Sequence, residues 1–212
     1  MINKAPRIRE LKVDKSPPKY ISEVDFNRVL KQDLGHPRFK MMFKLCWDTG
    51  MRLSEPFIGV LNGGWYDIPA DKSKNHEARS ITINQEHKDA ISKIQSIWQQ
   101  HSTEDAIKWY SKKFKKALIE IGILNRHFHC IRHSYGARRI LETNGNIYQV
   151  RDEMGHSSVM VTERYTRLNR KRVVEDFPSL ADKLNSQING IKDTIIKDTS
   201  QYLTPINRRD LN

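Results

Sequence analysis

The chain is poor in cysteine and lacks long apolar segments, and each shortage excludes a class of protein. Its 212 residues include only Cys46 and Cys130, which are too few for a disulfide framework or a zinc finger, so we expect two reduced, partly buried thiols. No apolar run approaches the roughly 20 residues of a membrane-spanning helix, and no signal peptide opens the chain. We therefore expect a cytoplasmic protein without a membrane partner.

Acidic residues are the minority among the charged ones. The chain carries 37 lysines and arginines against 25 aspartates and glutamates, which gives a formal net charge of +12. An excess of this size favours an anionic partner, because it speeds encounter and raises non-specific affinity. Solvated surface lysines can account for part of the charge. Nucleic acid is nonetheless the partner class that the composition favours over a membrane surface.

Three regions of the chain differ in composition. Residues 1–20 are basic and contain three of the eight prolines, which predicts an extended linker, either a disordered terminus or a strap along a phosphate backbone. Residues 21–185 carry the periodic apolar pattern of one folded domain. Residues 186–212 hold scattered isoleucines but little else to bury, so we expect a tail that becomes ordered only on a partner.

The spacing of apolar residues predicts an α+β fold that is mainly helical. Several segments repeat apolar residues at three and four positions, which places them on one face of a helix. Short apolar segments beside turn signals predict a small antiparallel sheet, with a charged loop at its tip over 70–78. The expected helices are 22–30, 37–50, 90–98, 107–121, 129–144, 147–154, 159–168 and 178–185, and the expected strands are 57–61, 65–68 and 79–83.

Basic side chains and one candidate nucleophile, spread over the folded region, suggest phosphodiester chemistry. A phenol has a pKa of about 10 and attacks at neutral pH only where cations stabilise the phenolate. Attack on a backbone phosphate would leave a phosphotyrosine ester, which keeps the bond energy for rejoining without ATP. The set that would form this cationic cage is Arg52, Lys74, His129, Arg132, His156 and Tyr165.

Two arginines of the set suit the role of phosphate clamps. Each guanidinium group presents a rigid fork that matches two phosphate oxygens and never loses its charge, so Arg52 and Arg132 can hold the non-bridging oxygens. Glu55 follows Arg52 by three residues. It is either a simple salt-bridge partner of Arg52 or a group that orients it, and we favour the second interpretation.

The remaining residues of the set are candidates for proton transfer. His129 stands three positions before Arg132 at the start of an expected helix, where it can accept the tyrosine proton. His156 follows a glycine in an expected turn and can bond the phosphate or relay a proton. Lys74, in the loop at the tip of the sheet, would protonate the leaving 5′-oxygen, and Lys72 competes for that role.

Metal binding is an alternative interpretation of the histidine-rich segment. His129 and His133 are four positions apart and His127 is close, which is a spacing that metal ligands use. The segment lacks the glutamate of the zinc-protease motif, and Arg132 would repel a cation. We therefore expect no metal here.

The motifs around these residues, taken in order, resemble the tyrosine recombinase (phage integrase) family. They read TGMRLSE, SKNHEAR, HCIRHS and MGH, with Tyr165 nine residues after His156, and they span residues 18–168. The resemblance implies that the six residues are catalytic and that the fold is helical with a small three-stranded sheet. It also implies cleavage of double-stranded DNA through a 3′-phosphotyrosyl link, with no metal or nucleotide cofactor.

The same resemblance implies an assembly and a setting. Members exchange strands through a Holliday junction within a tetramer, and their C-terminal tails dock on a neighbouring protomer. An integrase of a phage or another mobile element would act at the nucleoid, in the cytoplasm of a bacterial, archaeal or phage-infected cell. The family also carries an N-terminal helical domain, where this chain has only a linker-like stretch. The alternatives are a type IB topoisomerase and a DNA-binding relative without catalysis.

Overall fold

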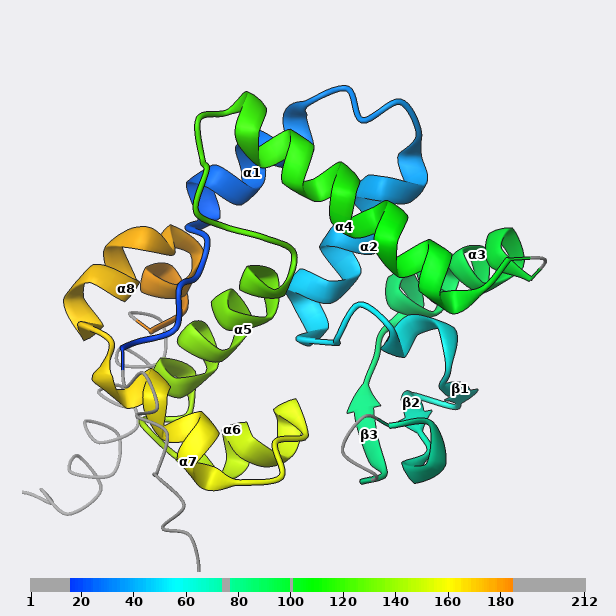
Figure 1. The fold of residues 1–212 in the computed structure, drawn as a ribbon. Helices are drawn as coiled ribbons and strands as arrows, with labels where there is room; N and C mark the ends of the chain where they lie inside the picture. Colours follow the sequence, from blue (N-terminus) through cyan, green and yellow to red (C-terminus); the bar gives the residue numbers. More distant parts are fainter. Residues whose placement is uncertain (1–15, 74–76, 100, 185–212) are drawn as a thin grey trace, which may run out of the picture.

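The computed structural model describes residues 16–73, 77–99 and 101–184 and is mainly helical, with one small sheet (Figure 1). This confirms the α+β class expected from the sequence. The helices are α1 (Glu23–Lys31), α2 (Pro37–Thr49), α3 (Gln85–Trp98), α4 (Thr103–Glu120), α5 (His129–Glu142), α6 (Ile147–Met154), α7 (Val159–Glu163) and α8 (Arg170–Asp176). The strands are β1 (Val60–Asn62), β2 (Trp65–Ile68) and β3 (Arg79–Thr82), and single 3₁₀ turns cover Glu55–Phe57, Ala70–Lys72 and Arg164–Arg167.

The central helix, α2, is bounded by local sequence signals. Pro37 occupies its first turn, where the missing N–H costs nothing. Gly50 ends the helix in the left-handed conformation, with φ of +66°. A Cβ at this position would lie 2.4 Å from the Tyr135 ring, so only glycine lets α5 approach here. The tight turn places Arg52 two residues after Gly50.

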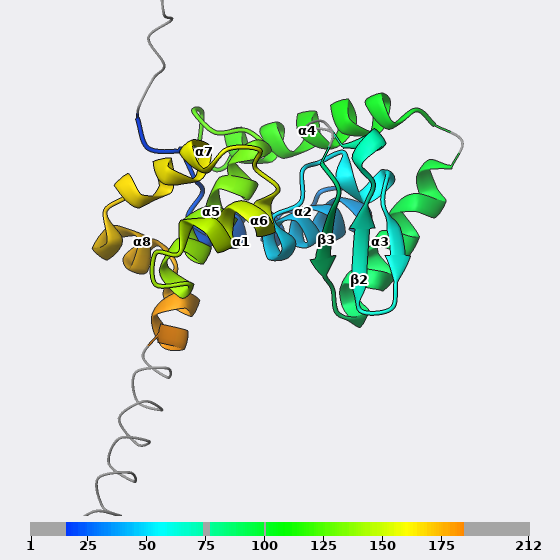
Figure 2. The ribbon, with the colours of Figure 1, turned by 90° about the horizontal axis from the view of Figure 1, so that it is seen from below.

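The three strands form an antiparallel sheet in the order β1-β2-β3. In its register Tyr66 pairs with Ile81, and Ile68 pairs with Arg79. Arg79 and Ile81 alternate with outward residues, so an arginine shares the inward face of β3 with a buried isoleucine. Figure 2 shows the sheet at one end of the molecule and α5 to α8 at the other, with α2 between them.

The core surrounds α2, which packs against α3, α4 and α5. Aromatic rings are part of this core, and some meet edge to face, as Phe43 does with Phe114 at a centroid distance of 4.8 Å. Cys46 and Cys130 are free and buried in this region, as the sequence led us to expect. None of the described helices is long and apolar enough to cross a bilayer.

Some expected elements differ in detail. The helix expected over 159–168 is α7 followed by a tighter 3₁₀ turn, which contains Tyr165. The strand expected over 57–61 is shortened to β1, because the chain first makes the 3₁₀ turn at Glu55–Phe57 around Pro56. Helix α8 was not expected, whereas the helix expected over 178–185 is found over 178–184, to the end of the described residues.

Some of the predictions concern residues that the structure does not describe. These are residues 1–15 of the expected linker, the whole expected tail over 186–212, and Lys74. The described end of the linker region runs alongside α5 and α8 (Figure 1). There the Ile21 N–H donates to Ser134 of α5 at 2.9 Å, and the Tyr20 hydroxyl donates to Asp176 of α8 at 2.6 Å.

Candidate active site

Arg52 is fixed by its own loop and by the end of α6. Its backbone N–H donates to Glu55 Oε2 at 2.6 Å, and its guanidinium donates to Glu55 Oε1 at 2.8 Å and to the Gly155 carbonyl at 2.7 Å. The side chain is 17% exposed, whereas that of Glu55 is 3% exposed. Glu55 is therefore a buried partner that orients Arg52, and not a solvated surface charge.

Arg132 reaches the same place from α5. It is 2% exposed, and it donates to the carbonyl of Gly50 at 2.7 Å and to that of Met154. Burial and, after it, the neighbouring Arg79 and Arg52 lower the pKa of its guanidinium to about 9, against the attraction of Glu55. Its two carbonyl partners tie the end of α2 to the end of α6.

A third arginine, Arg79 of β3, joins the cluster, although the sequence alone did not place it there. Its guanidinium bonds Glu55 Oε2 and donates to the Glu153 carbonyl at 2.5 Å. Burial works against the charge of Glu55, but Arg79, Arg132 and Arg52 together hold the pKa of that carboxyl below its usual value. Three guanidinium groups thus surround one ionised carboxylate, and positive charge remains in excess.

His156 follows α6 through Gly155, which ends that helix in the left-handed conformation. Its Nδ1 lies 2.9 Å from Thr162 Oγ1, and its ring is stacked on that of Tyr165 at 6.5 Å between centroids. Burial lowers the pKa of His156 to about 3, and Arg132 and Arg52 act in the same direction. The ring is therefore neutral at physiological pH and can accept one hydrogen bond while donating another.

Tyr165 is in the interior, next to the cationic cluster. It is 2% exposed, and its Oη lies 2.8 Å from His133 Nδ1. Burial raises the pKa of the phenol to about 12, although Arg132 and Arg164 oppose the rise. Burial likewise lowers the pKa of His133 to about 3, so the neutral ring can accept a hydrogen bond from the phenol. His133 had been considered only as a metal ligand.

His129 is exposed at the start of α5, one helical turn before His133 and on the same face of the helix. Its ring meets that of His133 edge to face at 4.7 Å. Within the described residues, no group of three histidine, cysteine, aspartate or glutamate side chains could hold a metal ion. Lys72 is exposed in the 3₁₀ turn after β2, and its competitor Lys74 lies outside the described residues.

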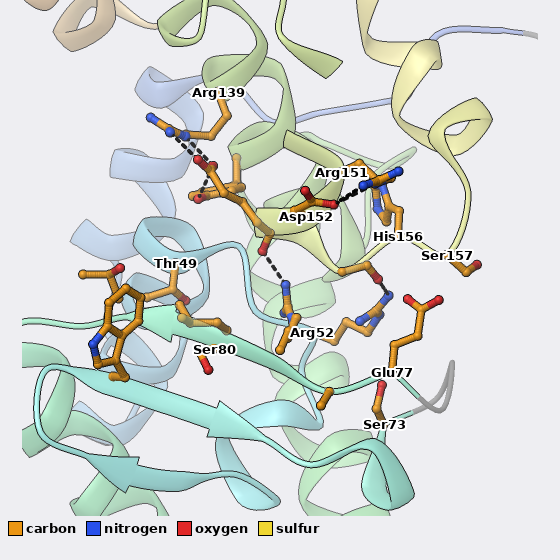
Figure 3. Close-up of a pocket in the computed structure, with 18 of the residues that line it drawn as sticks. Thr49, Arg52, Ser73, Glu77, Ser80, Arg139, Arg151, Asp152, His156 and Ser157 are labelled. Carbon is orange, nitrogen blue, oxygen red and sulfur yellow. Dashed lines mark hydrogen bonds and ion pairs between the residues drawn. The ribbon is translucent and has the colours of Figure 1, made fainter. Parts of the chain in front are cut away.

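Two cavities open beside the arginines. The larger, of about 780 Å³, lies between the sheet and α6 and contains Arg52, Arg79 and His156 in its lining. Figure 3 shows Arg52 near its centre, with Arg139 towards one end and Ser157 towards the other. The smaller, of about 170 Å³, is lined by Arg52, Arg132 and His129. Tyr165 lines neither, so the candidate nucleophile is closed off from both spaces.

Four of the six candidate residues, Arg52, Arg132, His156 and Tyr165, are thus gathered around the C-terminal end of α6, with His129 at the margin. A site built in this way can bind an anion with two or three guanidinium groups and present a phenol and neutral imidazoles to it. The sequence contained one signal for Arg79, which we had not assigned to the site. A charged residue on the inward face of a strand needs a buried partner.

Comparison with known proteins gives a consistent result. The model of the phage integrase family matches residues 22–172. The tyrosine recombinase XerC of Escherichia coli O157:H7 (strain EC4115 / EHEC) is 28% identical over 187 residues, which are 79% of this chain and 62% of that protein. XerC of Actinobacillus pleuropneumoniae serotype 7 (strain AP76) is 26% identical, over 79% of this chain and 60% of that protein. The chain therefore spans about three fifths of the length of these relatives.

Solved structures share the fold. The XerH site-specific recombinase, in a post-cleavage complex with a palindromic difH substrate, superposes with a TM-score of 0.55 at 18% identity, over 76% of this chain and 52% of that one. The XerA recombinase superposes with a TM-score of 0.53 at 19% identity, over 81% of this chain and 66% of that one.

Proposed function

The chain belongs to the phage integrase family, and on that premise we propose that it cleaves and rejoins DNA strands in site-specific recombination. The observation that carries the proposal is the position of the Tyr165 phenol beside the buried guanidinium group of Arg132. Arg132 belongs with Arg52 and Arg79 to a cluster of three guanidinium groups around the Glu55 carboxylate, so positive charge exceeds the local negative charge. A phosphodiester is an anion that this cluster can bind, and a phenol is a nucleophile that can attack it.

The proposed reaction uses side chains alone. The Tyr165 oxygen attacks phosphorus, the bond from phosphorus to the 5′-oxygen breaks, and a 3′-phosphotyrosyl ester remains. The phenol proton passes to an imidazole, and the leaving 5′-oxygen takes a proton from a lysine, for which we propose Lys74. A 5′-hydroxyl then attacks the ester and releases the tyrosine. Arg52, Arg132 and His156 stabilise the charge on the phosphate oxygens throughout, so we propose that neither metal nor ATP takes part.

Cleavage requires a rearrangement, because a phenol that is 2% exposed cannot meet a phosphate in a duplex. We propose that DNA binding moves the short segment of α7 and the 3₁₀ turn that follows it. In the DNA-free state His133 holds the phenol through their hydrogen bond. In the bound state His129, which lines the small cavity with both arginines, accepts the proton.

The wider assembly is proposed on family grounds. We propose that residues 21–185 are a catalytic domain that binds double-stranded DNA, after a basic linker over 1–20. We further propose a tetramer on two duplexes, in which the tail 186–212 docks on the neighbouring protomer. Such an enzyme would act at the nucleoid, in the cytoplasm.

A covalent-trapping experiment tests the function without knowledge of the target site. The chain is incubated, in EDTA and without nucleotide, with a pool of nicked duplexes that carry a randomised segment beside the nick. Loss of the short fragment at the nick prevents religation, so attached DNA accumulates and is seen on a denaturing gel. We expect an adduct from the wild type, attached at Tyr165 by mass spectrometry, and none from Tyr165→Phe. An adduct from Tyr165→Phe, or none from the wild type, contradicts the proposal.

The duplexes recovered in this way separate recombinase from topoisomerase. We expect the trapped strand to join a second duplex of the same sequence. Relaxation of a supercoiled plasmid with no transfer between duplexes would instead favour the type IB topoisomerase.

A further inference from the structure

Three consecutive carbonyls at the end of α6 each accept a hydrogen bond from a different arginine. Glu153 accepts from Arg79, Met154 from Arg132, and Gly155 from Arg52. The last carbonyls of a helix have no partner within it and carry the negative end of its dipole. The three guanidinium groups come from β3, α5 and the loop after α2, so one helix end holds three separate parts of the fold together. His156 follows this end directly.

Arg79 and Arg52 also share a side-chain partner, Glu55. Arg79 bonds Glu55 Oε2, the same oxygen that accepts the backbone N–H of Arg52. The other oxygen of Glu55 accepts from the Arg52 guanidinium. Arg79 and Glu55 are 7% and 3% exposed at their side chains, so water does not compete for this bond. A chain of contacts therefore runs from Arg79 through Glu55 to Arg52.

The charge of Arg79 decides how much of the charge of Arg52 is left for a ligand. Without Arg79, Arg52 and Arg132 would face the buried Glu55 carboxylate with one positive charge in excess. With Arg79 present, Glu55 is shared by the guanidinium groups of Arg52 and Arg79, and the excess of the whole cluster rises to two positive charges. In a buried site this difference matters more than at a surface, because solvent screens it less.

The methylene groups of the Arg79 side chain also pack against Gly155, the residue before His156. A Cβ at Gly155 would lie 2.6 Å from Arg79 Cδ, so the methylene groups pack directly on this glycine. Gly155 has φ of +58°, the left-handed conformation that glycine adopts at a helix end without a Cβ clash. Arg79 therefore contacts both Glu55, which orients Arg52, and Gly155, which forms the turn before His156.

We propose that Arg79 is a positioning residue for strand cleavage, which aligns Arg52 through Glu55 and His156 through the end of α6. The inference rests on the proposed function. Arg79 acts through Arg52 and His156, and its role is to hold both side chains in the positions from which they bind the phosphate. The opposing interpretation is that Arg79 is only a buried ion pair that stabilises the fold.

Two substitutions and one matched control distinguish these interpretations. Arg79→Met keeps the length of the side chain and removes its charge, while Arg79→Lys keeps the charge and loses the fork. The control is Arg138→Met, because Arg138 is a partly buried arginine of α5 that stacks on Trp47 at 4.4 Å and donates to the Trp47 carbonyl, away from the cluster. Thermal unfolding of each variant measures the structural cost.

The readout is the single-turnover rate of adduct formation on a recovered nicked duplex, with DNA affinity measured separately. We expect Arg79→Met to lower the rate about 10²-fold, the typical effect of losing a preorganised donor, with DNA affinity within about threefold. We expect Arg79→Lys to recover at least about tenfold of that loss, and Arg138→Met to cleave at the wild-type rate although it is destabilised.

A pH profile supplies a readout that stability alone would not move. The groups that act on Glu55 are Arg79, Arg132 and Arg52, and nearby Cys46 and Tyr66 have raised pKa values, so neither titrates in acid. Without Arg79 the pKa of Glu55 rises, and a Glu55 that has taken up a proton no longer holds the Arg52 guanidinium in place by charge. The rate of Arg79→Met, divided by the wild-type rate, should therefore fall further as the pH is lowered from about 7 to about 5.

The outcomes separate this inference from the proposed function. If the wild type forms no adduct, the function fails and the inference fails with it. If the wild type forms the adduct but Arg79→Met cleaves at the same rate, or Arg138→Met loses as much rate at equal stability, only the role of Arg79 is overturned. A rate ratio that does not depend on pH likewise overturns the route through Glu55.

Discussion

The Nδ1 atom of His133 lies 2.8 Å from the Oη atom of Tyr165, with the phenol buried and the imidazole half-buried. The bond joins α5 to the 3₁₀ turn after α7. It satisfies the one polar atom of a phenol that is otherwise surrounded by core residues. The tyrosine that would attack DNA is therefore held, in the DNA-free structure, as part of the core.

A double-mutant cycle measures this bond. Tyr165→Phe and His133→Ala each leave one buried polar atom without its partner, which costs about 1–3 kcal/mol of unfolding free energy in addition to lost packing. The double variant removes both atoms, so we expect it to lose about 1 kcal/mol less than the two single losses added together. Urea unfolding of the four proteins gives the coupling energy, and strict additivity would contradict the bond.

Gly136 makes the burial of Tyr165 possible. A Cβ at this position of α5 would lie 2.6 Å from Cε1 and Cζ of the phenol ring, a distance at which the ring must move. We expect Gly136→Ala to lower the unfolding free energy by about 1–3 kcal/mol, as overpacking does. We also expect tetranitromethane to nitrate Tyr165 faster in the variant, as followed by mass spectrometry.

Gly64→Ala is the matched control, because a Cβ there would meet nothing within 4 Å. It should leave both stability and nitration of Tyr165 close to the wild type. Equal nitration in Gly136→Ala and the wild type would show that the ring can stay in place.

The two neutral imidazoles make stability depend on pH. The pKa values of His133 and His156 are about 3 in the folded chain, and an unfolded chain has histidine pKa values of about 6.5. Between these values the unfolded chain binds two protons that the folded chain does not, so the free energy of unfolding falls as the pH falls. We expect each ring to contribute a slope of up to about 1.4 kcal/mol per pH unit between about pH 6 and about pH 5.

Urea unfolding at several pH values measures this slope. His133→Gln and His156→Gln should each reduce this slope by the contribution of one histidine, up to about 1.4 kcal/mol per pH unit. If neither variant changes the slope, the two rings are not held neutral by the fold. The chosen window lies above the pH at which the paired carboxyl groups titrate, because the pKa values of Glu55, Glu142 and Glu153 are lowered.

Local signals were enough to predict the elements that carry the site, whereas long-range partners were not. Helix α6 was expected over 147–154 and is found there, because its ends depend on neighbours in sequence: Asn146 accepts from the Gln149 N–H, and Gly155 takes the left-handed turn. The motifs predicted a shared site for Arg52, Arg132, His156 and Tyr165, and the fold brings these residues together.

The contacts that were missed join residues far apart in the chain. Arg79 meets Glu55 across 24 positions, and His133 meets Tyr165 across 32. Neither pair is constrained by helical or strand periodicity, so only the packing of β3 and of the turn after α7 brings them together. The spacing of His133 from His129 suggested a metal site, because periodicity reports which side chains share a helix face and not what faces them.

Glu55 is the single carboxylate among three guanidinium groups, and its loss should be costly. Glu55→Gln keeps the shape of the side chain but leaves buried positive charge without its counterion. We expect the unfolding free energy to fall by about 3–5 kcal/mol, the usual result of removing one partner of a buried pair. Thermal or urea unfolding measures the loss. Glu175→Gln is the control, since its pair with Lys171 is 64% and 87% exposed and should be worth less than about 1 kcal/mol.

The role of Arg132 can be tested with the charge retained. Its guanidinium reaches the Gly50 and Met154 carbonyls at once, and a lysine ammonium is too compact to span both while also meeting a phosphate. We expect Arg132→Lys to bind DNA within about threefold of the wild type, because the net charge is unchanged and phosphate contacts dominate affinity. We expect its rate of adduct formation to fall about 10²–10³-fold, as when one preorganised donor is removed. If Arg132→Lys cleaves at the wild-type rate, charge alone suffices, and the rigid fork that ties α2 to α6 has no part in the reaction.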